Sequence, residues 1–483
     1  MRVLYVSTEV YPFVKTGGLA DVNAALPPAL IDLDLDVRML LPGLPGLMSA
    51  VSGRRRLVTL GSAFGAGEIS IWQARLDDVP VYLIDAPELY AREGGPYTDS
   101  AGRDWPDNPM RFALLGWIAA RFADGIIEDW RPQVVHSHDW HAALAPAYLA
   151  ARGGNRPASV FTVHNLSFQG QYSPETFTGL KLPPHFFTLH GVEFHGMVNF
   201  MKAGLHYADR ITTVSPSYAK EIQTPAYGCG MDGVLRSRAG ALTGILNGID
   251  RGVWDPATDR HIAVRYSRKD VSGKIACKRA LCGELGLQGG EKNPLFAVVS
   301  RLTDQKGLDL LLEVLPDVIR RGGRLAVMGT GAPEIEAKFR EAVARYPGRV
   351  AVHINYDEAF AHRIVAGADV IVVPSRFEPC GLTQMYGLAY GTLPLVRRVG
   401  GLADTVRDTN AVNIAAAAAT GFVFDDAQPA ALAAACARVF ELWRKSALWA
   451  ELRENAMRQN FGWTVSAQHY LEIYRELRPF TAR

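Results

Sequence analysis

The sequence predicts an α/β chain of two domains, each built on a doubly wound parallel sheet. Short apolar runs such as Val370–Val373, which are typical of strands buried on both faces, alternate with stretches long enough for helices. The alternation stops in a polar stretch after residue 247 and restarts near residue 293. The 483 residues are enough for two or three domains of about 100–200 residues each. Such alternation predicts right-handed βαβ units with helices on both faces of each sheet.

In the first half, apolar and β-branched runs predict the strands, and a turn at Asp77-Asp78 predicts a hairpin. The expected strands are 1–7, 36–41, 69–76, 79–84, 134–137, 159–163, 211–214 and 242–246. Helices are expected after the segment 15–21 to about residue 30, over about 109–129, and after residue 141. Residues 86–108 are expected to form a loop, and 170–205 to be irregular with helical pieces.

Asn247–Asp250 is interpreted as a hinge, so that a first domain of residues 1–246 precedes a second of residues 247–457. In the second domain the expected strands are 295–302, 324–328, 350–354, 370–373 and 422–424. The expected helices are 309–320, 333–345, 357–366 and about 383–391, followed by two or three helices over 429–477.

Composition excludes several classes of protein. The net charge of +2 predicts neither a nucleic-acid partner nor a membrane surface. Five cysteines without C-x-x-C spacing indicate a reducing compartment and no disulfide or zinc framework. The apolar run Val3–Val6 is too short for a signal peptide, and no segment approaches the roughly 20 apolar residues of a membrane span. A soluble, cytoplasmic protein is expected.

The stretch after Val370–Val373 predicts a ligand site. The strand is followed by a loop with Glu378 and Gly381, and a helix is expected to begin near Leu382 and Thr383. A helix N-terminus offers free N–H groups to an anion, and a nearby carboxylate can bind hydroxyl groups. This combination points to a ligand with an anionic part and a hydroxyl-rich part, such as a nucleotide sugar.

A second candidate site lies in the loop that follows the strand ending near residue 302. Arg301 and Lys306 could converge on one diphosphate, Arg through its planar fork and Lys as a point charge. Both would stabilise the charge that develops on a leaving diphosphate without a metal ion.

The first domain carries polar side chains at its strand ends. His164 ends a predicted buried strand, at the sheet edge where ligands bind in folds of this kind. Asp139 and Trp140 follow another strand and suit a sugar site, with a carboxylate for hydroxyls and an aromatic face for a pyranose. The same segment allows an alternative, because His136 and His138 could ligate a metal together with Asp139, as in metal-dependent hydrolases.

Three motifs together resemble bacterial glycogen synthases and plant starch synthases: Lys15-Thr16-Gly17-Gly18, Ser300–Gly307, and Glu378-Pro379-Cys380-Gly381-Leu382. The likeness runs nearly from end to end. It implies two Rossmann-like domains that face each other across a deep cleft, the B-type glycosyltransferase architecture. Residues 458–483 would form a helix that crosses back to the first domain. The implied reaction transfers glucose from ADP-glucose to the non-reducing end of an α-1,4-glucan such as glycogen, with retention of configuration.

The resemblance also implies roles for individual residues. Lys15 and Gly18 would contact the donor, and Arg301 and Lys306 would hold its diphosphate. Glu378 would bind the glucosyl hydroxyls, and the backbone of Leu382 and Thr383 would bind phosphate. His164 would stabilise the developing oxocarbenium ion or the sugar 6-hydroxyl. Further residues of the nucleotide-sugar and acceptor sites would be Tyr97, Asp139, Trp140, Asn165, Asn247 and Gly381.

Many retaining transferases of this fold carry a second Glu eight positions after the first, where this chain has Tyr386, and the synthase branch lacks that Glu as well. With no second carboxylate placed as a nucleophile, front-face attack is expected, in which the departing phosphate accepts the proton of the acceptor. No metal or other cofactor is expected. Besides the hydrolase, the alternatives are a sugar-nucleotide epimerase and a non-catalytic nucleotide-binding module.

Overall fold

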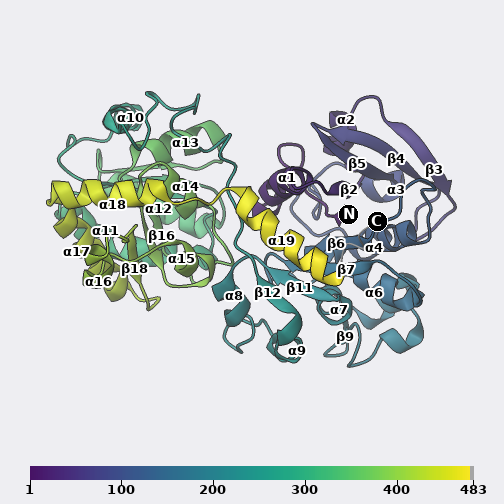
Figure 1. The fold of residues 1–483 in the computed structure, drawn as a ribbon. Coiled ribbons are helices and arrows are strands. Elements are labelled where there is room, and N and C mark those ends of the chain that lie inside the picture. The colour runs from purple at the N-terminus through teal and green to yellow at the C-terminus, as the bar shows by residue number, and fades with distance from the viewer. Residues whose placement is uncertain (479–483) are drawn as a thin grey trace. The chain divides into compact units, whose positions relative to one another are not determined.

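The computed structural model describes residues 1–478, and this part of the chain divides into two compact α/β units (Figure 1). The first unit comprises Met1–Gly248 and the segment that begins at Trp463, and the second comprises Ile249–Gly462. The boundaries expected from the sequence lie a few residues earlier in the chain. No helix of the described chain is both long enough and apolar enough to cross a membrane.

Within the described residues, the main sheet of the first unit has nine strands in the order β12-β11-β7-β6-β1-β2-β5-β4-β3. From β12 to β5 neighbouring strands are parallel, whereas β4 pairs antiparallel with both β5 and β3. The pairing of Leu76 with Val79 confirms the predicted hairpin. The strands are β1 (Arg2–Val6), β2 (Asp36–Pro42), β3 (Arg55–Leu60), β4 (Ile69–Leu76), β5 (Val79–Asp85), β6 (Val134–His138), β7 (Ala158–Val163), β11 (Arg210–Thr213) and β12 (Leu242–Gly244).

The region expected to be irregular contains a small antiparallel sheet of β8 (Gln171–Tyr172), β10 (Met197–Asn199) and β9 (Glu193–Phe194). The helices of this unit are α1 (Gly18–Ile31), α2 (Pro45–Ala50), α3 (Pro87–Tyr90), α4 (Asn108–Ala123), α5 (Asp139–Ala142), α6 (Leu144–Arg152), α7 (Phe200–Tyr207), α8 (Pro216–Glu221), α9 (Asp232–Ser237) and α19 (Trp463–Leu477). Short 3-10 turns are η1 (Pro174–Leu180), η2 (Pro184–Phe186) and η3 (Ala239–Ala241).

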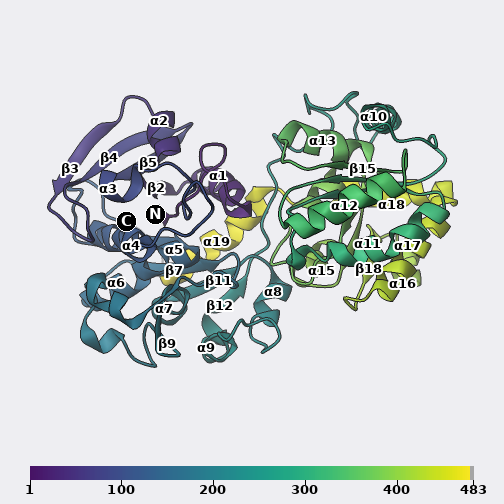
Figure 2. The ribbon, with the colours of Figure 1, turned by 180° about the vertical axis from the view of Figure 1, so that it is seen from behind.

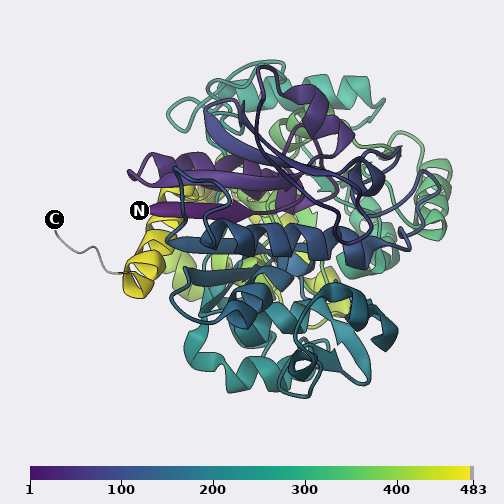
Figure 3. The same ribbon diagram turned by 90° about the vertical axis from the view of Figure 1, so that its right-hand side faces the viewer.

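The C-terminal helix α19 belongs to the first unit, where it packs beside α1 (Figure 3). Two polar contacts attach it to the sheet. The hydroxyl of Tyr474 lies 2.6 Å from Nδ1 of His136 on β6, and the hydroxyl of Ser466 donates to the carbonyl of Leu246 at 2.6 Å. The last described helix is therefore held by β6 and by the segment that follows β12.

In the described part of the second unit, six strands form an all-parallel sheet in the order β15-β14-β13-β16-β17-β18. The strands are β13 (Leu295–Val299), β14 (Arg324–Met328), β15 (Val350–His353), β16 (Val370–Val373), β17 (Leu393–Arg397) and β18 (Phe422–Phe424). The sequence analysis did not predict β17, which contains Pro394. This proline is tolerated because pairing with β18 begins only at Leu395.

Helices cover both faces of this sheet. Helices α11 and α12 lie toward the viewer in Figure 2, whereas α14 and α18 lie toward the viewer in Figure 1. The helices and turns are α10 (Ser272–Glu284), η4 (Asp304–Lys306), α11 (Leu308–Arg320), α12 (Pro333–Arg345), α13 (Glu358–Gly367), α14 (Thr383–Ala389), α15 (Gly400–Thr405), α16 (Ala411–Ala415), α17 (Pro429–Trp443) and α18 (Ser446–Arg458). Helix α10 falls in the polar stretch for which no helix was predicted, since its buried face includes Lys274 and Lys278.

Gly307, at the start of α11, allows the loops that follow β13 and β16 to approach each other closely. Gly307 has φ +61°, and a Cβ added there would lie 2.2 Å from the carbonyl oxygen of Pro374. Gly286 has a similar φ of +63°, but the space around it is open. The two positions separate the cost of the left-handed backbone from the cost of the steric contact.

We therefore expect Gly307→Ala to lower the free energy of unfolding by about 1–3 kcal/mol more than Gly286→Ala, because only the first substitution forces two backbone segments apart. Chemical denaturation of both variants beside the wild type measures this difference. Equal losses for the two variants would contradict the prediction.

Candidate functional site

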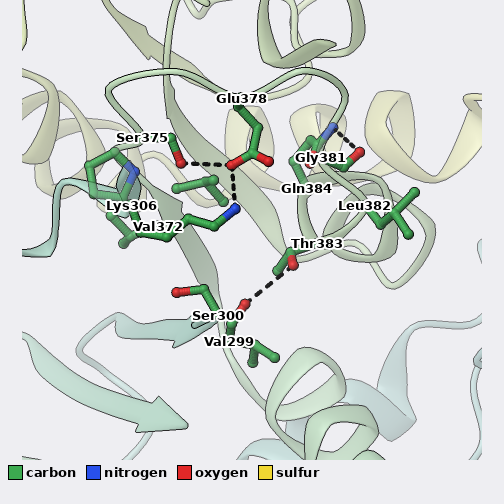
Figure 4. A pocket seen from close by; sticks show the side chains of 12 residues that line it. Val299, Ser300, Lys306, Val372, Ser375, Glu378, Gly381, Leu382, Thr383 and Gln384 are labelled. Carbon is green, nitrogen blue, oxygen red and sulfur yellow. Dashed lines mark hydrogen bonds and ion pairs between the residues drawn. The ribbon is translucent and has the colours of Figure 1, made fainter. Parts of the chain in front are cut away.

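The strand order of the second sheet reverses between β13 and β16, because β13 leads through α11 to β14 on one side and β16 leads through α14 to β17 on the other. In open α/β sheets, ligands bind beyond the carboxyl ends of the strands at such a reversal. A pocket lies there (Figure 4). Its lining residues are Val299, Ser300, Lys306, Val372, Val373, Pro374, Ser375, Glu378, Gly381, Leu382, Thr383 and Gln384.

A carboxylate with two donors lines this pocket. Oε2 of Glu378 accepts from Nζ of Lys306 at 2.6 Å and from the hydroxyl of Ser375 at 2.8 Å, as Figure 4 shows. The side chains of Lys306 and Glu378 are only 15% and 8% exposed. Each charge is therefore compensated by the other in a site largely shielded from water, and both remain within reach of the pocket.

Further contacts hold together the two loops that carry Lys306 and Glu378. The amide of Arg376 donates to the carbonyl of Gln305 at 2.8 Å, and the guanidinium of Arg376 forms a two-pronged ion pair with Asp309. The amide of Gly401 donates to the carbonyl of Glu378 at 3.2 Å. The loops after β13 and β16 are thus cross-linked, although Lys306 and Glu378 are 72 positions apart in sequence.

The start of α14 completes the pocket. The hydroxyl of Thr383 donates to the carbonyl of Val299 at 3.2 Å and so joins the helix start to the end of β13. The side-chain amide of Gln384 donates to the carbonyls of Cys380 and Gly381. The structure therefore brings five residues singled out in the sequence to one pocket: Lys306, Glu378, Gly381, Leu382 and Thr383.

Two predicted donor residues lie outside this lining. Arg301 follows the lining residue Ser300 but is exposed, and within residues 1–478 its guanidinium has neither a hydrogen-bond nor an ionic partner. Asn247 is buried and belongs to the first unit, a few residues after β12.

The first sheet reverses its strand order in the same way, between β1 and β6. Buried polar side chains gather at the carboxyl ends of these strands and of β7. Thr8 and Glu9 follow β1, Asp139 follows β6, and His164 follows β7. The sheet reversal again predicts a ligand site at this edge.

A hydrogen-bonded network connects these strand ends to Tyr97. The Tyr97 hydroxyl donates to Oε1 of Glu9 at 2.5 Å and lies 2.8 Å from the Thr8 hydroxyl and 3.0 Å from Nε2 of His141. Burial raises the pKa of both Glu9 and Tyr97. The other Glu9 oxygen accepts from the backbone amides of Thr16 and Gly17 at 2.6 and 3.3 Å.

Glu9 thus holds the Lys15–Gly18 loop against the sheet. Lys15 forms an ion pair with Asp21 at 2.8 Å, and its ammonium lies 4.8 Å from the centre of the Tyr11 ring. Gly18 is the first residue of α1.

Asp139 occupies an unusual backbone position, with φ +57°. Its Oδ1 accepts from the amides of His164 and Asn165 at 2.8 and 3.4 Å. Burial raises the pKa of Asp139 to about 7, despite these two donors, and lowers the pKa of His164 to about 3. The imidazole of His164 is therefore neutral at physiological pH, beside a carboxyl that titrates there.

The histidines considered as metal ligands form a buried row instead. His136 uses both nitrogens, Nδ1 with the hydroxyl of Tyr474 and Nε2 with that of Thr162, each at 2.6 Å. It has no nitrogen left for a metal ion. Nδ1 of His138 lies 3.0 Å from Nε2 of His164. No cluster of three or more potential metal-ligating side chains occurs among the residues described.

Trp140 is part of an aromatic group at the same edge. Its ring lies 4.9 Å from Phe112, 5.9 Å from Tyr97 and 6.5 Å from Tyr172, measured between centroids. Trp140 is partly exposed.

Sequence reasoning missed Ser375, Glu9, Thr8 and His141, all of which bond to site residues. A signal was present for some of them. Thr8 and Glu9 directly follow a buried strand, as His164 does, and Ser375 follows another. Their partners, however, are distant in sequence, so hydroxyl and carboxyl side chains at these positions are not distinguishable from turn residues by pattern alone.

Comparison with known proteins supports the predicted fold and enzyme class independently of the site geometry. Residues 2–237 match the family described as the starch synthase catalytic domain, and residues 293–441 match glycosyl transferases group 1. The chain is 54% identical over 480 residues to the glycogen synthase of Yersinia enterocolitica, covering 99% of this chain and 100% of that one. It is 51% identical over 484 residues to the glycogen synthase of Francisella tularensis subsp. novicida, covering 99% of each.

Solved structures agree. The catalytic domain of starch synthase IV from Arabidopsis thaliana, bound to ADP and acarbose, has a TM-score of 0.89 and 31% identity, covering 98% of this chain and 99% of that one. A sucrose-phosphate synthase from Thermosynechococcus elongatus shares the fold at 18% identity and a TM-score of 0.61, covering 99% and 98% of the two chains. These likenesses confirm the predicted fold class and enzyme class. The chain belongs to the glycogen and starch synthase family of glycosyltransferases with the two-domain B-type fold.

Proposed function

We propose that this enzyme takes its glucosyl group from ADP-glucose and adds it to the non-reducing end of an α-1,4-glucan, with retention of configuration. The observation that carries the proposal is the convergence of Lys306, Glu378 and Thr383 on one pocket at the strand reversal of the second sheet. The starch synthase from Arabidopsis, which is similar over nearly its whole length, was solved with ADP and acarbose.

In this proposal the second unit binds the donor. The diphosphate is held by the side chains of Lys306 and of Arg301, which directly follows the pocket residue Ser300. The backbone amides of Gly381, Leu382 and Thr383 bind it as well. Lys306 is already beside the pocket through its bond with Glu378. When the diphosphate binds Lys306 in place of Glu378, the Glu378 carboxylate still accepts from the hydroxyl of Ser375. It can then also accept hydrogen bonds from the hydroxyls of the glucosyl group.

The first unit contributes the acceptor and sugar side. A neutral His164 does not repel the positive charge that develops on the oxocarbenium ion, and it can bond to a sugar hydroxyl. Tyr97, Asp139, Trp140 and Asn165 bind the glucan, as the carboxylate, amide and aromatic faces suit a pyranose. Lys15, Gly18 and Asn247 complete the donor contacts.

The chemistry needs no metal in this scheme, because cationic side chains and helix amides stabilise the leaving diphosphate. No side chain is assigned as a covalent nucleophile. The acceptor hydroxyl attacks on the face from which the diphosphate departs, and the departing phosphate takes its proton. A cytoplasmic location agrees with five cysteines that show no C-x-x-C spacing, and it is part of the proposal.

Incubation with labelled ADP-glucose or UDP-glucose, with and without glycogen, tests the substrates. We expect label to enter glycogen from ADP-glucose far faster than from UDP-glucose, with unchanged rates in a metal chelator. Preference for UDP-glucose, release of free glucose only, or loss of activity in the chelator would each contradict a separate part of the proposal.

Lys306→Ala should lower kcat by about 10²–10³-fold and change the donor KM much less, because a group that stabilises developing charge acts mainly in the transition state. Steady-state kinetics measures both constants. Lys338→Ala, an exposed lysine on α12, is the matched control and should behave as the wild type. A rise in KM with kcat unchanged would mean that Lys306 only binds the ground state.

Asp139→Asn should stabilise the protein in a pH-dependent way. The folded-state pKa of about 7 exceeds the usual 3.8, so the folded state holds the proton more tightly than the unfolded state. Ionisation therefore costs stability increasingly from about pH 4 to pH 7, by up to about 1–4 kcal/mol. Asn avoids this cost, can still accept from the His164 amide, and tolerates a positive φ.

The measurement is the difference in Tm between Asp139→Asn and the wild type. We expect this difference to be clearly larger at pH 8 than at pH 5. The same Tm difference at both pH values would show that ionisation of Asp139 has little effect on folding.

A further inference from the structure

His138 and His164 share a hydrogen bond, and the surrounding atoms determine which of the two rings donates it. Nδ1 of His138, at the end of β6, lies 3.0 Å from Nε2 of His164, which directly follows β7. His138 is fully buried and His164 nearly so. Burial lowers the pKa of both rings, to about 3 for His164 and well below the usual value for His138. Each ring therefore carries one proton near neutral pH, and one proton lies between them.

Two arrangements of this proton are conceivable. If His164 donated through Nε2–H, the single proton of His138 would be on its own Nε2. That nitrogen is buried and has no hydrogen-bond partner among the described residues. A buried N–H would then lack an acceptor, and such orphaned donors are rare in folded proteins. If His138 donates through Nδ1–H instead, only a lone pair at Nε2 remains without a partner.

The aromatic neighbours of His138 do not provide an acceptor for an N–H at its Nε2. The ring of Tyr5 is stacked on His138, with centroids 4.0 Å apart and an interplanar angle of 29°. An N–H bond lies in the plane of its imidazole, so it runs roughly along the Tyr5 face instead of pointing into it. His136 approaches from 4.0 Å with a tilt of 39°, and both of its nitrogens are occupied by Tyr474 and Thr162.

We infer that His138 is a positioning residue, which donates from Nδ1–H to Nε2 of His164 and so fixes His164 as the Nδ1–H tautomer. His164 then presents an N–H donor from Nδ1, and an oxygen atom of the sugar accepts from it. This second step rests on the proposed function of His164, whereas the tautomer itself does not. The usual tautomer of a neutral histidine in water is Nε2–H, so the assignment differs from the default.

The first experiment reads the tautomer directly. The full-length protein labelled with ¹⁵N-histidine is examined near pH 7.5 by long-range ¹H–¹⁵N correlation, and the His164 signals are assigned by their loss in His164→Gln. We expect a protonated Nδ1 and an unprotonated, hydrogen-bonded Nε2 for His164. An Nε2–H tautomer in the wild type would overturn the inference, whatever the enzyme's activity.

The second experiment compares two replacements of His138. Asn places its amide N–H close to the position of Nδ1, whereas Phe keeps an aromatic ring beside Tyr5 but has no donor. We expect His138→Phe to lower kcat by about 10–100-fold with little change in donor KM, by analogy with the loss of a partner that orients a metal-ligating histidine, and His138→Asn to recover most of that loss.

The readouts separate this inference from the proposed function. A purely structural His138 would lower Tm in both variants and leave the His164 tautomer of the folded protein unchanged in His138→Phe, and that result would overturn the positioning role. If the wild type transferred no glucose from ADP-glucose, the proposed function would fail, and the tautomer measured by NMR would still decide the inference.

Discussion

The site in the second unit depends on the parallel pairing of β13 with β16. Because the two strands are parallel neighbours, their carboxyl ends emerge at the same edge of the sheet, and their helices depart in opposite directions. The loops that follow them are left facing each other, and Lys306 and Glu378 meet there at 2.6 Å. The same constraint acts on β1 and β6 in the first unit, where it gathers Glu9 and Asp139 at one edge.

The two units handle buried charge differently. The second unit places a cation against a carboxylate, so that the pair is neutral as a whole. The first unit keeps His138 and His164 uncharged by burial, and its carboxyls at Glu9 and Asp139 have raised pKa values. A site that meets a diphosphate benefits from fixed positive charge, whereas one that meets a neutral glucan needs donors and acceptors without strong charge.

Much of the fold was predictable because buried parallel strands have a strong local signature. Val370–Val373 was identified as a strand with the bounds that the structure shows, and the hairpin at Asp77-Asp78 was confirmed. The failures have local causes. Strand β17 carries Pro394, which ordinarily argues against a strand, and α10 buries lysines, which weakens its apolar pattern. The tertiary structure tolerates both, because the end of β17 with Pro394 does not yet pair with β18 and because backbone carbonyls accept from Lys274 and Lys278.

The sequence by itself determined the family, the alternation of strands and helices, and which residues follow the strand ends, since these depend on local composition and on motifs. Only the tertiary structure decided which of those residues meet. In the structure, Ser375 and Lys306 both donate to Glu378, and Arg301 lies outside the lining of that pocket. His136 bonds to the hydroxyl of Tyr474, which lies 338 positions later in the sequence. The physical reason is that hydrogen bonds and ion pairs depend on distances of a few ångströms between side chains, and strand order sets those distances.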